Sequence, residues 1–437
     1  MTPPTEPPAP PDPSTAPPAR SRRALVAGSV GNFVEWYEFG VYGYFATVIA
    51  ANFFTPEGGG DAEALVKTYA SFALAFFFRP VGAALFGRLG DRIGRRPTLI
   101  VVIVLMTTAT TLIGLLPTYA TIGAAAPWLL TLLRILQGLS AGGEFGGAVS
   151  LLTEFAPPGR RGLYGSWQSF TVALGLLGGA GVAALLATLL TPGALNDWGW
   201  RVPFLLTLPL GLVALWLRLR LEETPNFAAA QHTSPPPPRR ADVARAIFLG
   251  AGRIMGWAAA GYTFLVVLPS YLQSTLNASF REALVATVLA NLGFAVSIVP
   301  AGLLSDRIGR RTVMLTGAGL VTALSLPLIN LLQSDGTSTT GKGAAVFAAG
   351  VVVGLMAGPG PAMLAEMFPT SVRCTGLGLA YALSNAVFSG CAGLIITELI
   401  KRTGDADIPA YYAAGACALS MLALLTLRGN DHREPLR

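Results

Sequence analysis

The 437-residue sequence predicts an all-α membrane protein whose twelve transmembrane helices form two six-helix bundles. Hydrophobic residues make up 52% of the chain and charged residues only 12%, which is typical of a polytopic membrane protein. Apolar runs of about 20 residues, the length that crosses a bilayer, recur along the chain. A polar motif between two of these runs, Gly87-Arg-Leu-Gly-Asp-Arg-Ile-Gly-Arg-Arg-Pro97, returns about 215 positions later as Gly302-Leu-Leu-Ser-Asp-Arg-Ile-Gly-Arg-Arg311. The repeat indicates that the two halves are related copies.

The apolar runs predict six spans in each half. In the first half they cover residues 24–54, 66–86, 99–119, 128–154, 163–190 and 202–219. In the second half they cover residues 246–271, 283–304, 312–332, 344–367, 375–399 and 410–427. We therefore expect an N-terminal bundle over residues 24–219 and a C-terminal bundle over residues 246–428. The polar residues 220–245 should connect the bundles, residues 1–23 should form a disordered Pro-rich tail, and residues 429–437 should form a short second tail.

Lysine and arginine are distributed unevenly between the two sides of the predicted membrane. Of the 30 basic residues, 21, Arg218 among them, lie in or beside the tails, the central segment and the loops with the repeated motifs, six lie in or beside the alternate loops, and three lie within spans. Because cytoplasmic loops are enriched in basic residues, both termini and residues 220–245 are predicted to be cytoplasmic. Topology therefore explains the net charge of +7, which does not indicate nucleic-acid binding.

The two polar motifs are predicted to act as a gate. Asp91 and Asp306 lie at span ends, where a carboxylate can accept hydrogen bonds from backbone N–H groups or arginines. A second pair of segments, Glu154-Phe-Ala-Pro157 with Arg161 and Glu366-Met-Phe-Pro369 with Arg373, repeats at an offset of about 212. Ties between the halves at these sites would hold one access state and break in the other. The predicted gate residues are Gly87, Asp91, Arg92, Gly94, Arg95, Arg96, Asp306, Arg310, Arg311, Glu154, Arg161, Glu366 and Arg373.

Carboxylates within apolar spans are costly in hydrocarbon, so they are candidates for function. Glu35 and Glu38 are three residues apart in the first span and should share one helix face. Glu35, Arg79 and Glu144 lie at similar depths from the same side of the membrane, so they are expected to meet in one cavity. Glu35 and Glu38 are the first candidates for a coupling proton, and Glu144 is the next.

Two arginines within spans, Arg79 and Arg134, are candidates for holding a solute carboxylate through paired hydrogen bonds. Trp36, Tyr42 and Gln168 are further candidates for solute contact. The structural alternative is that an Arg–Glu pair only locks helices together and that the aromatic and amide groups only pack. For the Gly-rich run over residues 138–147 the structural interpretation is preferred, because its small residues let a neighbouring backbone approach closely.

Other classes of site lack the residues that they need. The two histidines, His232 and His432, fall in the central loop and the tail, and Cys374, Cys391 and Cys417 lack metal or redox spacing. Gly336 to Lys342 approaches a P-loop, but Gly343 stands where Ser or Thr is required. We expect no enzyme activity, no cofactor, no metal, no ATP and no nucleic-acid partner.

Several motifs resemble those of the metabolite:proton symporters of the major facilitator superfamily. These are Gly31-Asn-Phe-Val-Glu-Trp-Tyr-Glu-Phe-Gly40, Arg79-Pro80, the first polar motif, Gln137-Gly-Leu-Ser-Ala-Gly-Gly-Glu144 and Glu222-Glu-Thr-Pro225. Asp197-Trp-Gly-Trp-Arg-Val-Pro-Phe204 and Pro409-Ala-Tyr-Tyr412 are most similar to the proline/betaine transporters. Glu38 departs from the pattern, because the family usually has Asp there.

The resemblance implies alternating access and proton-driven uptake of a small carboxylate-bearing solute in a bacterial cytoplasmic (inner) membrane. Proline or glycine betaine is the first expectation. The alternative is an organic acid such as 2-oxoglutarate, citrate or shikimate. A non-transporting membrane sensor is a more remote alternative. The expected partners are thus the solute, the proton and the lipid bilayer.

Overall fold

The computed structural model describes residues 18–55, 61–93, 95–154, 156–157, 159–220, 239–369 and 372–429. Within its helices, the side chains of residues 18–28, 61–62, 87–88, 90–93, 95–96, 151 and 154 are outside the description. Most of the predicted N-terminal tail, the central connection and the C-terminal tail therefore lie outside the described residues.

All regular structure among the described residues is helical. The first half contains α1 (Pro18–Tyr44), α2 (Ala46–Ile49), η2 (Ala50–Phe54), α3 (Asp61–Ile93), α4 (Arg95–Leu115), α5 (Tyr119–Ile122), α6 (Ala125–Ala141), α7 (Phe145–Glu154), α8 (Arg161–Leu189), α9 (Pro192–Ala194), η3 (Leu195–Gly199), α10 (Arg201–Leu205) and α11 (Thr207–Leu219). The second half contains α13 (Arg240–Tyr262), η4 (Thr263–Val267), α14 (Leu268–Ser274), α15 (Phe280–Ile308), α16 (Arg310–Gln333), α17 (Thr339–Ala357), α18 (Gly360–Met367), α19 (Arg373–Ser384), η6 (Asn385–Ser389), α20 (Ala392–Thr403) and α21 (Ile408–Leu425). The elements labelled η are π-helical turns.

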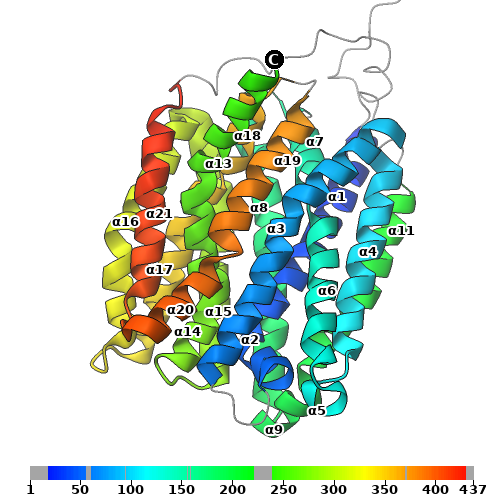
Figure 1. Cartoon of the computed structure of the whole chain (residues 1–437). Coiled ribbons are helices and arrows are strands. Elements are labelled where there is room, and N and C mark those ends of the chain that lie inside the picture. Colours follow the sequence, from blue (N-terminus) through cyan, green and yellow to red (C-terminus); the bar gives the residue numbers. More distant parts are fainter. Residues whose placement is uncertain are drawn as a thin grey trace, which may run out of the picture.

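The two halves stand side by side (Figure 1). The helices of the second half, coloured green to red, occupy the left of the view, and α3, α4 and α6 of the first half occupy the right. The halves meet where α8 packs along α15 and where α3 and α7 pack against α19. The space between the halves is therefore bordered by helices from both.

Ten of the twelve predicted spans are helices of sufficient length and apolarity to cross a membrane, counted over the described residues. The first and fourth predicted spans are also helical but are not among the ten. Polar residues such as Asn32, Glu35 and Glu38 lower the hydropathy of the first. The fourth is interrupted at residues 142–144, which separates α6 from α7. Both exceptions carry residues that were singled out as functional candidates.

The polar motifs are not the loops that the sequence predicts. In the second copy, α15 continues to Ile308 and α16 begins at Arg310, so a single residue separates the two helices. That residue, Gly309, has φ +93°, a conformation that favours glycine. In the first copy, the backbone is helical to Ile93 and again from Arg95. The hydropathy pattern misses these helix ends because they are polar.

The Gly-rich run packs tightly at some positions and not at others. A Cβ atom on Gly138 would come within 1.8 Å of the Ala75 carbonyl oxygen, and one on Gly142 within 2.1 Å of the Arg79 carbonyl oxygen. The backbones of α6 and α3 therefore touch. A Cβ atom on Gly147 would meet nothing within 4 Å, so close packing does not explain this glycine.

Candidate functional site

The acidic pair on α1 is buried, with Glu35 5% exposed and Glu38 fully covered. Its two members are held by different helices. Glu35 accepts a hydrogen bond from Arg79 of α3 at 3.3 Å, and Glu38 accepts one from Thr110 of α4 at 2.8 Å. The second oxygen of Glu38, Oε1, has no hydrogen-bond partner among the described residues. Glu35 and Glu38 thus share one face of α1 but contact two different helices, α3 and α4.

Arg79 lies among aromatic rings as well as beside Glu35. Its guanidinium carbon is 4.3 Å from the ring centroids of both Phe39 and Phe76, and 5.4 Å from that of Trp36. The Nε atom has no hydrogen-bond partner among the described residues. Ring faces stabilise a buried cation while leaving its N–H groups available. Arg79 can therefore bind a second anion without losing its packing.

Arg134 of α6 is fully buried and is less well satisfied. Its Nη1 donates to Gln137 Oε1 at 2.6 Å, whereas Nε and Nη2 have no hydrogen-bond partner within the described part of the chain. The guanidinium carbon lies 4.1 Å from the Tyr42 ring centroid and 4.8 Å from that of Phe72. Buried N–H groups of a cation are costly when unpaired and well suited to a carboxylate.

A chain of hydrogen bonds joins Arg134 to Glu38. Gln137 receives a hydrogen bond from Arg134 and donates one to the Thr110 hydroxyl, which in turn donates to Glu38. The guanidinium and the carboxylate are thus linked through two neutral side chains without direct contact. A change of charge on Glu38 can therefore reorient Gln137 and change which N–H groups of Arg134 are available to a ligand.

Glu144, which the sequence predicts to meet Glu35 and Arg79 in one cavity, forms its ion pair with a different arginine. It pairs with Arg218 of α11, which also donates to the Leu99 carbonyl oxygen at 2.7 Å. Gly31 leaves room for this pair, because a Cβ atom there would lie 2.0 Å from Arg218 Nη2. Arg218, counted among the basic residues of the cytoplasmic side, is buried and not solvated as a loop arginine would be, since its side chain is only 2% exposed. Its position at the end of a predicted span hid its role.

The remaining solute candidates occupy different places. Trp36 lines a cavity between the halves. Tyr42 donates to the Thr68 carbonyl oxygen at 3.3 Å and lies against Arg134, away from that cavity. Gln168 lies between α8 and α1, with its amide 3.5 Å from the Asn32 side-chain oxygen. Trp36 is therefore the one of these three that borders the cavity.

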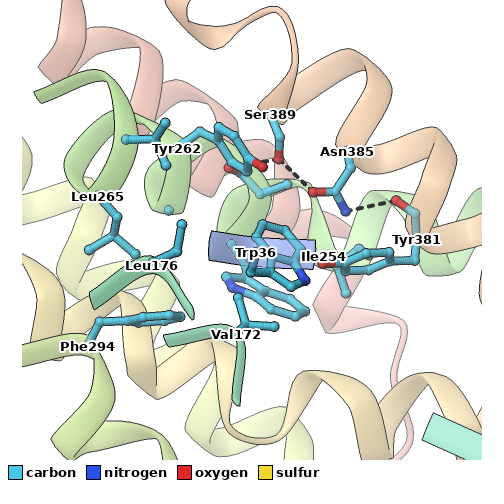
Figure 2. A pocket seen from close by; sticks show the side chains of 14 residues that line it. Trp36, Val172, Leu176, Ile254, Tyr262, Leu265, Phe294, Tyr381, Asn385 and Ser389 are labelled. Atoms are coloured by element: carbon cyan, nitrogen blue, oxygen red, sulfur yellow. Dashed lines mark hydrogen bonds between the residues drawn. The ribbon is translucent and has the colours of Figure 1, made fainter. Parts of the chain in front are cut away.

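The cavity is enclosed by helices of both halves and is shown in Figure 2. Its volume of about 30 Å³ is room for about two waters. Asn385 donates to the Tyr381 carbonyl oxygen at 2.9 Å, and Ser389 donates to Asn385 Oδ1 at 2.8 Å. None of the described residues that line it is charged; they are Trp36, Val172, Leu176, Ile254, Trp257, Ala258, Gly261, Tyr262, Leu265, Val266, Phe294, Tyr381, Asn385 and Ser389.

Charged residues join the halves near α18, at the upper end in Figure 1. Asp306 of α15 accepts hydrogen bonds from the backbone N–H groups of Gly162 and Leu163, at 2.8 and 2.9 Å, at the start of α8. Arg310 pairs with Asp306 at 2.7 Å and with Glu366 at 3.1 Å, and Arg161 of the first half lies 3.5 Å from Glu366. Four predicted gate residues therefore lie in one cluster across the interface.

The other predicted gate residues are less completely described. Arg373 is buried at the start of α19 and donates to the carbonyl oxygens of Ala365 and Phe368, each at 3.2 Å. Arg311 follows Arg310 in α16 and is half-buried. Gly87 is in α3 and Gly94 is outside the described residues. The side chains of Asp91, Arg92, Arg95, Arg96 and Glu154 are also outside the described part.

Hydrogen bonds also join the halves toward the opposite end, near α14 and α2. The hydroxyls of Tyr69 and Ser270 are 2.6 Å apart and buried. Thr47 donates to Gln273 at 3.1 Å, and Asn291 donates to the Tyr44 hydroxyl at 3.4 Å. Polar contacts therefore join the halves at both ends of the interface, and the cavity lies between them.

Known families match both halves of the chain. Residues 24–234 match the family described as "Sugar (and other) transporter", and residues 248–437 match the "Major Facilitator Superfamily". The ectoine/proline transporter ProP of Corynebacterium glutamicum is 35% identical over 97% of this chain and 87% of its own length. The proline/betaine transporter of Escherichia coli K12 is 34% identical, with coverages of 95% and 85%.

Two further similarities bear on the range of solutes and on the fold. A citrate-proton symporter of Klebsiella pneumoniae is 35% identical over 92% of this chain and 90% of its own length. The structure of the proton:xylose symporter XylE aligns with a TM-score of 0.75 at 17% identity, over 93% of this chain and 95% of that one. At this identity the structural likeness establishes the fold alone.

Proposed function

The chain belongs to the major facilitator superfamily of membrane transporters, and from this premise we propose that it imports a small zwitterion, such as proline or glycine betaine, together with protons. The observation that carries the proposal is the buried set of Glu35, Arg79 and Arg134, which adjoins a closed cavity between the halves. Relatives named for proline, betaine and ectoine transport support the choice of solute. The superfamily consists of transporters, so the chain is a multi-pass membrane protein and not an enzyme.

Arg79 and Arg134 bind the carboxylate of the solute. Arg134 contributes the N–H groups that have no partner among the described residues, and Arg79 contributes its free Nε. Both guanidiniums lie against Phe39, at 4.3 and 5.0 Å, so they face a common region of the N-terminal half. A carboxylate between them would gain charge-assisted hydrogen bonds from both.

Protonation of Glu35 couples the proton to the solute. Ionised Glu35 occupies Arg79, so a solute carboxylate must compete for the same guanidinium. When Glu35 takes up a proton, it loses its charge and releases Arg79 to the solute. The proton and the zwitterion therefore bind together and leave together. Protonation of Glu38 likewise favours solute binding by Arg134, through the hydrogen bonds of Thr110 and Gln137.

Glu144 has a different part in this scheme. Its pairing with Arg218 neutralises it and ties α11 to the turn between α6 and α7. It is the next candidate for the proton only if neither carboxylate of α1 carries it. Trp36 contacts the solute from the cavity side, whereas Tyr42 supports Arg134 and Gln168 supports the α1–α8 contact.

Alternating access uses the two closed ends in turn. The cluster of Asp306, Arg310, Glu366 and Arg161 closes the cytoplasmic end, and the Tyr69–Ser270 contact closes the outer end. Opening one end while the other stays closed exposes the site to one side at a time. Of the remaining predicted gate residues, Arg311 and Arg373 belong to the second half, and the others are first-half counterparts of this cluster. We assign the protein to a bacterial inner membrane with both termini in the cytoplasm, on the distribution of its basic residues.

An organic acid is the second candidate solute. Two arginines close to one aromatic ring would suit a di- or tricarboxylate, and one relative is named for citrate. The uncharged aromatic lining of the adjoining cavity favours a zwitterion, since a second carboxylate would have no cation there. A non-transporting sensor would bind a solute without accumulating it.

Uptake into proteoliposomes tests the proposal. Labelled proline, glycine betaine, 2-oxoglutarate, citrate and shikimate are offered to vesicles that are more acidic outside than inside. Accumulation of proline or betaine that a protonophore abolishes would support the proposal. Accumulation of an organic acid alone would select the second candidate, and binding without accumulation would select the sensor.

A further inference from the structure

We infer that the cavity bordered by Trp36, Trp257, Tyr262 and Tyr381 binds the ammonium end of the solute and prefers an ammonium fully substituted by alkyl groups. This inference rests on the proposed function, because it divides the solute site into an arginine part and an aromatic part. It narrows the solute class to trialkylammonium carboxylates. It also predicts a rank order within that class.

The four rings come from three helices of the two halves. Trp36 belongs to α1, Trp257 and Tyr262 to α13, and Tyr381 to α19. Trp36 packs against Tyr262 at 6.3 Å and Trp257 against Tyr381 at 6.0 Å, with interplanar angles of 56° and 51°. Figure 2 shows Trp36 near the centre of the view, with Tyr262 and Tyr381 on opposite sides. The cavity is thus surrounded by tilted rings.

The charge of the ammonium would be met by ring faces. The cavity lining contains no carboxylate, so a cation there cannot form an ion pair with a lining residue. The π faces of Trp and Tyr attract cations, and the attraction is stronger where water is excluded. Each of the four aromatic side chains is between 4% and 8% exposed, so water is largely excluded.

The N–H groups of an unsubstituted ammonium would be poorly satisfied in this cavity. Asn385 Oδ1 already accepts from Ser389, and the lining is otherwise mostly apolar. The Tyr262 hydroxyl, which lacks a partner among the described residues, offers one additional acceptor. A primary ammonium brings three N–H donors, whereas a trimethylammonium brings none. Because unpaired buried donors are costly, each methyl group on nitrogen should improve binding.

The arginine part lies next to the aromatic part. Trp36 borders the cavity, and the Arg79 guanidinium carbon lies 5.4 Å from its ring centroid. Phe76 likewise packs against Tyr262 at 5.3 Å and against Arg79 at 4.3 Å. A short zwitterion placed along Trp36 would direct its carboxylate to Arg79 and its ammonium into the cavity. The rings must move apart to admit it, since the closed space holds about two waters.

A methylation series tests the inference. Glycine, N-methylglycine, N,N-dimethylglycine and glycine betaine compete with labelled glycine betaine for uptake into proteoliposomes under a pH gradient. We expect the inhibition constant to fall with each methyl group, by about tenfold or more over the series. Trp257→Leu should reduce the difference in inhibition constant between glycine and glycine betaine to about threefold or less, whereas Trp257→Phe should keep most of this difference. Trp128→Leu is the control, because Trp128 is 76% exposed and far from the cavity lining.

The outcomes separate this inference from the proposed function. A flat series in the unmodified protein, with uptake still driven by the pH gradient, would overturn the aromatic subsite and leave the proposed function intact. The aromatic subsite would also be overturned if the inhibition constant fell as steeply with methylation in folded Trp257→Leu as in the unmodified protein. If no solute accumulates, the proposed function fails, and calorimetric titration of the purified protein decides the subsite. Tighter binding of glycine betaine than of glycine would then support it, and equal affinities would overturn it.

Discussion

Arg134 combines full burial with two nitrogen atoms that have no hydrogen-bond partner among the described residues. Its surroundings are the rings of Phe39, Tyr42 and Phe72, which support the charge but cannot accept its N–H groups in ordinary hydrogen bonds. A carboxylate would supply the missing acceptors. Unpaired buried N–H groups lower the stability of a protein that has no ligand. The arrangement of Arg134 is therefore explained if a bound carboxylate pairs with these groups.

We expect Arg134→Lys to raise the KM for solute uptake by about tenfold, because a lysine cannot make the paired contact of a guanidinium. Initial uptake rates in proteoliposomes over a range of solute concentrations measure this change. Arg402→Lys is the matched control, since Arg402 is 72% exposed and pairs with Glu398 of its own helix at 2.6 Å. An unchanged KM in Arg134→Lys would remove this residue from the solute site.

The exchange of Glu35 for glutamine separates coupling from binding. Glu35→Gln cannot ionise, so Arg79 stays available while no proton is carried. We expect loss of accumulation under a pH gradient, with retention of solute exchange between the two sides. Glu38→Gln and the double variant complete the set, and Glu63→Gln is the control because Glu63 is an exposed carboxylate paired with Lys67. Accumulation by all three α1 variants would move the proton site elsewhere, first to Glu144.

The buried charges could be predicted from the sequence where they contrasted with their surroundings. Glu35, Arg79 and Arg134 stand out because charges are rare in apolar runs. Arg218 did not stand out, because an arginine at the end of a span resembles a loop arginine until its partner Glu144 is seen. Trp257 and Tyr381 were also missed, since one aromatic residue in a span looks like any other until distant helices bring the rings together.

At the scale of elements, helix positions follow from the apolar runs, but helix ends do not. α15 and α16 extend into the polar motif because a helix needs only local backbone hydrogen bonds, whether or not its side chains are apolar. The breaks at residues 142–144 and at the π-helical turns η4 and η6 also leave no hydropathy signal. Leu265 and Val266 of η4 and Asn385 and Ser389 of η6 line the cavity, so these interruptions are part of the site.

The Gly-rich run allows a matched test of element packing. Gly138→Ala would place a methyl group against the Ala75 carbonyl and force α6 away from α3, which we expect to cost about 2 kcal/mol of stability. Gly147→Ala should be neutral or slightly stabilising, because its Cβ position is open and alanine favours helix. The melting temperatures of the two purified variants in detergent measure the difference. Equal melting temperatures would contradict the close contact of these helices.

At the scale of the whole molecule, the two halves meet around the cavity and are joined by polar contacts at both ends. The fold class could be predicted because composition, apolar runs and repeated motifs agree, and membership of the superfamily confirms it. The state of the interface could not be predicted. It depends on contacts such as that of Asp306 with the first turn of α8, which join residues far apart in sequence.

Asp306→Asn tests the tie between the halves. An asparagine loses the ion pair with Arg310 and keeps only one oxygen to accept the N–H groups of Gly162 and Leu163. Because these contacts hold a state of the gate and do not border the cavity, turnover should fall by about tenfold while KM changes by less than about threefold. Asp335→Asn, in an exposed turn between α16 and α17, is the control. A large rise in KM at normal turnover would contradict the gating role.

The orientation of the protein in the membrane can be measured directly by cysteine labelling. In a background in which Cys374, Cys391 and Cys417 are replaced by alanine, Arg240→Cys should resist an impermeant thiol reagent added to intact cells. Asp335→Cys should react, since that turn is exposed and is predicted to face outward. Labelling of Arg240→Cys from outside would reverse the assigned topology.

The contacts at the two ends of the interface between the halves have a consequence for the membrane itself. Protons cross a protein readily along a continuous file of water molecules. While the Tyr69–Ser270 contact and the Asp306 cluster are both formed, polar side chains stand on each side of the cavity, in the way of such a file. A resting copy with both contacts formed should therefore leak few protons, which would let a cell hold many copies without discharging the potential across its membrane.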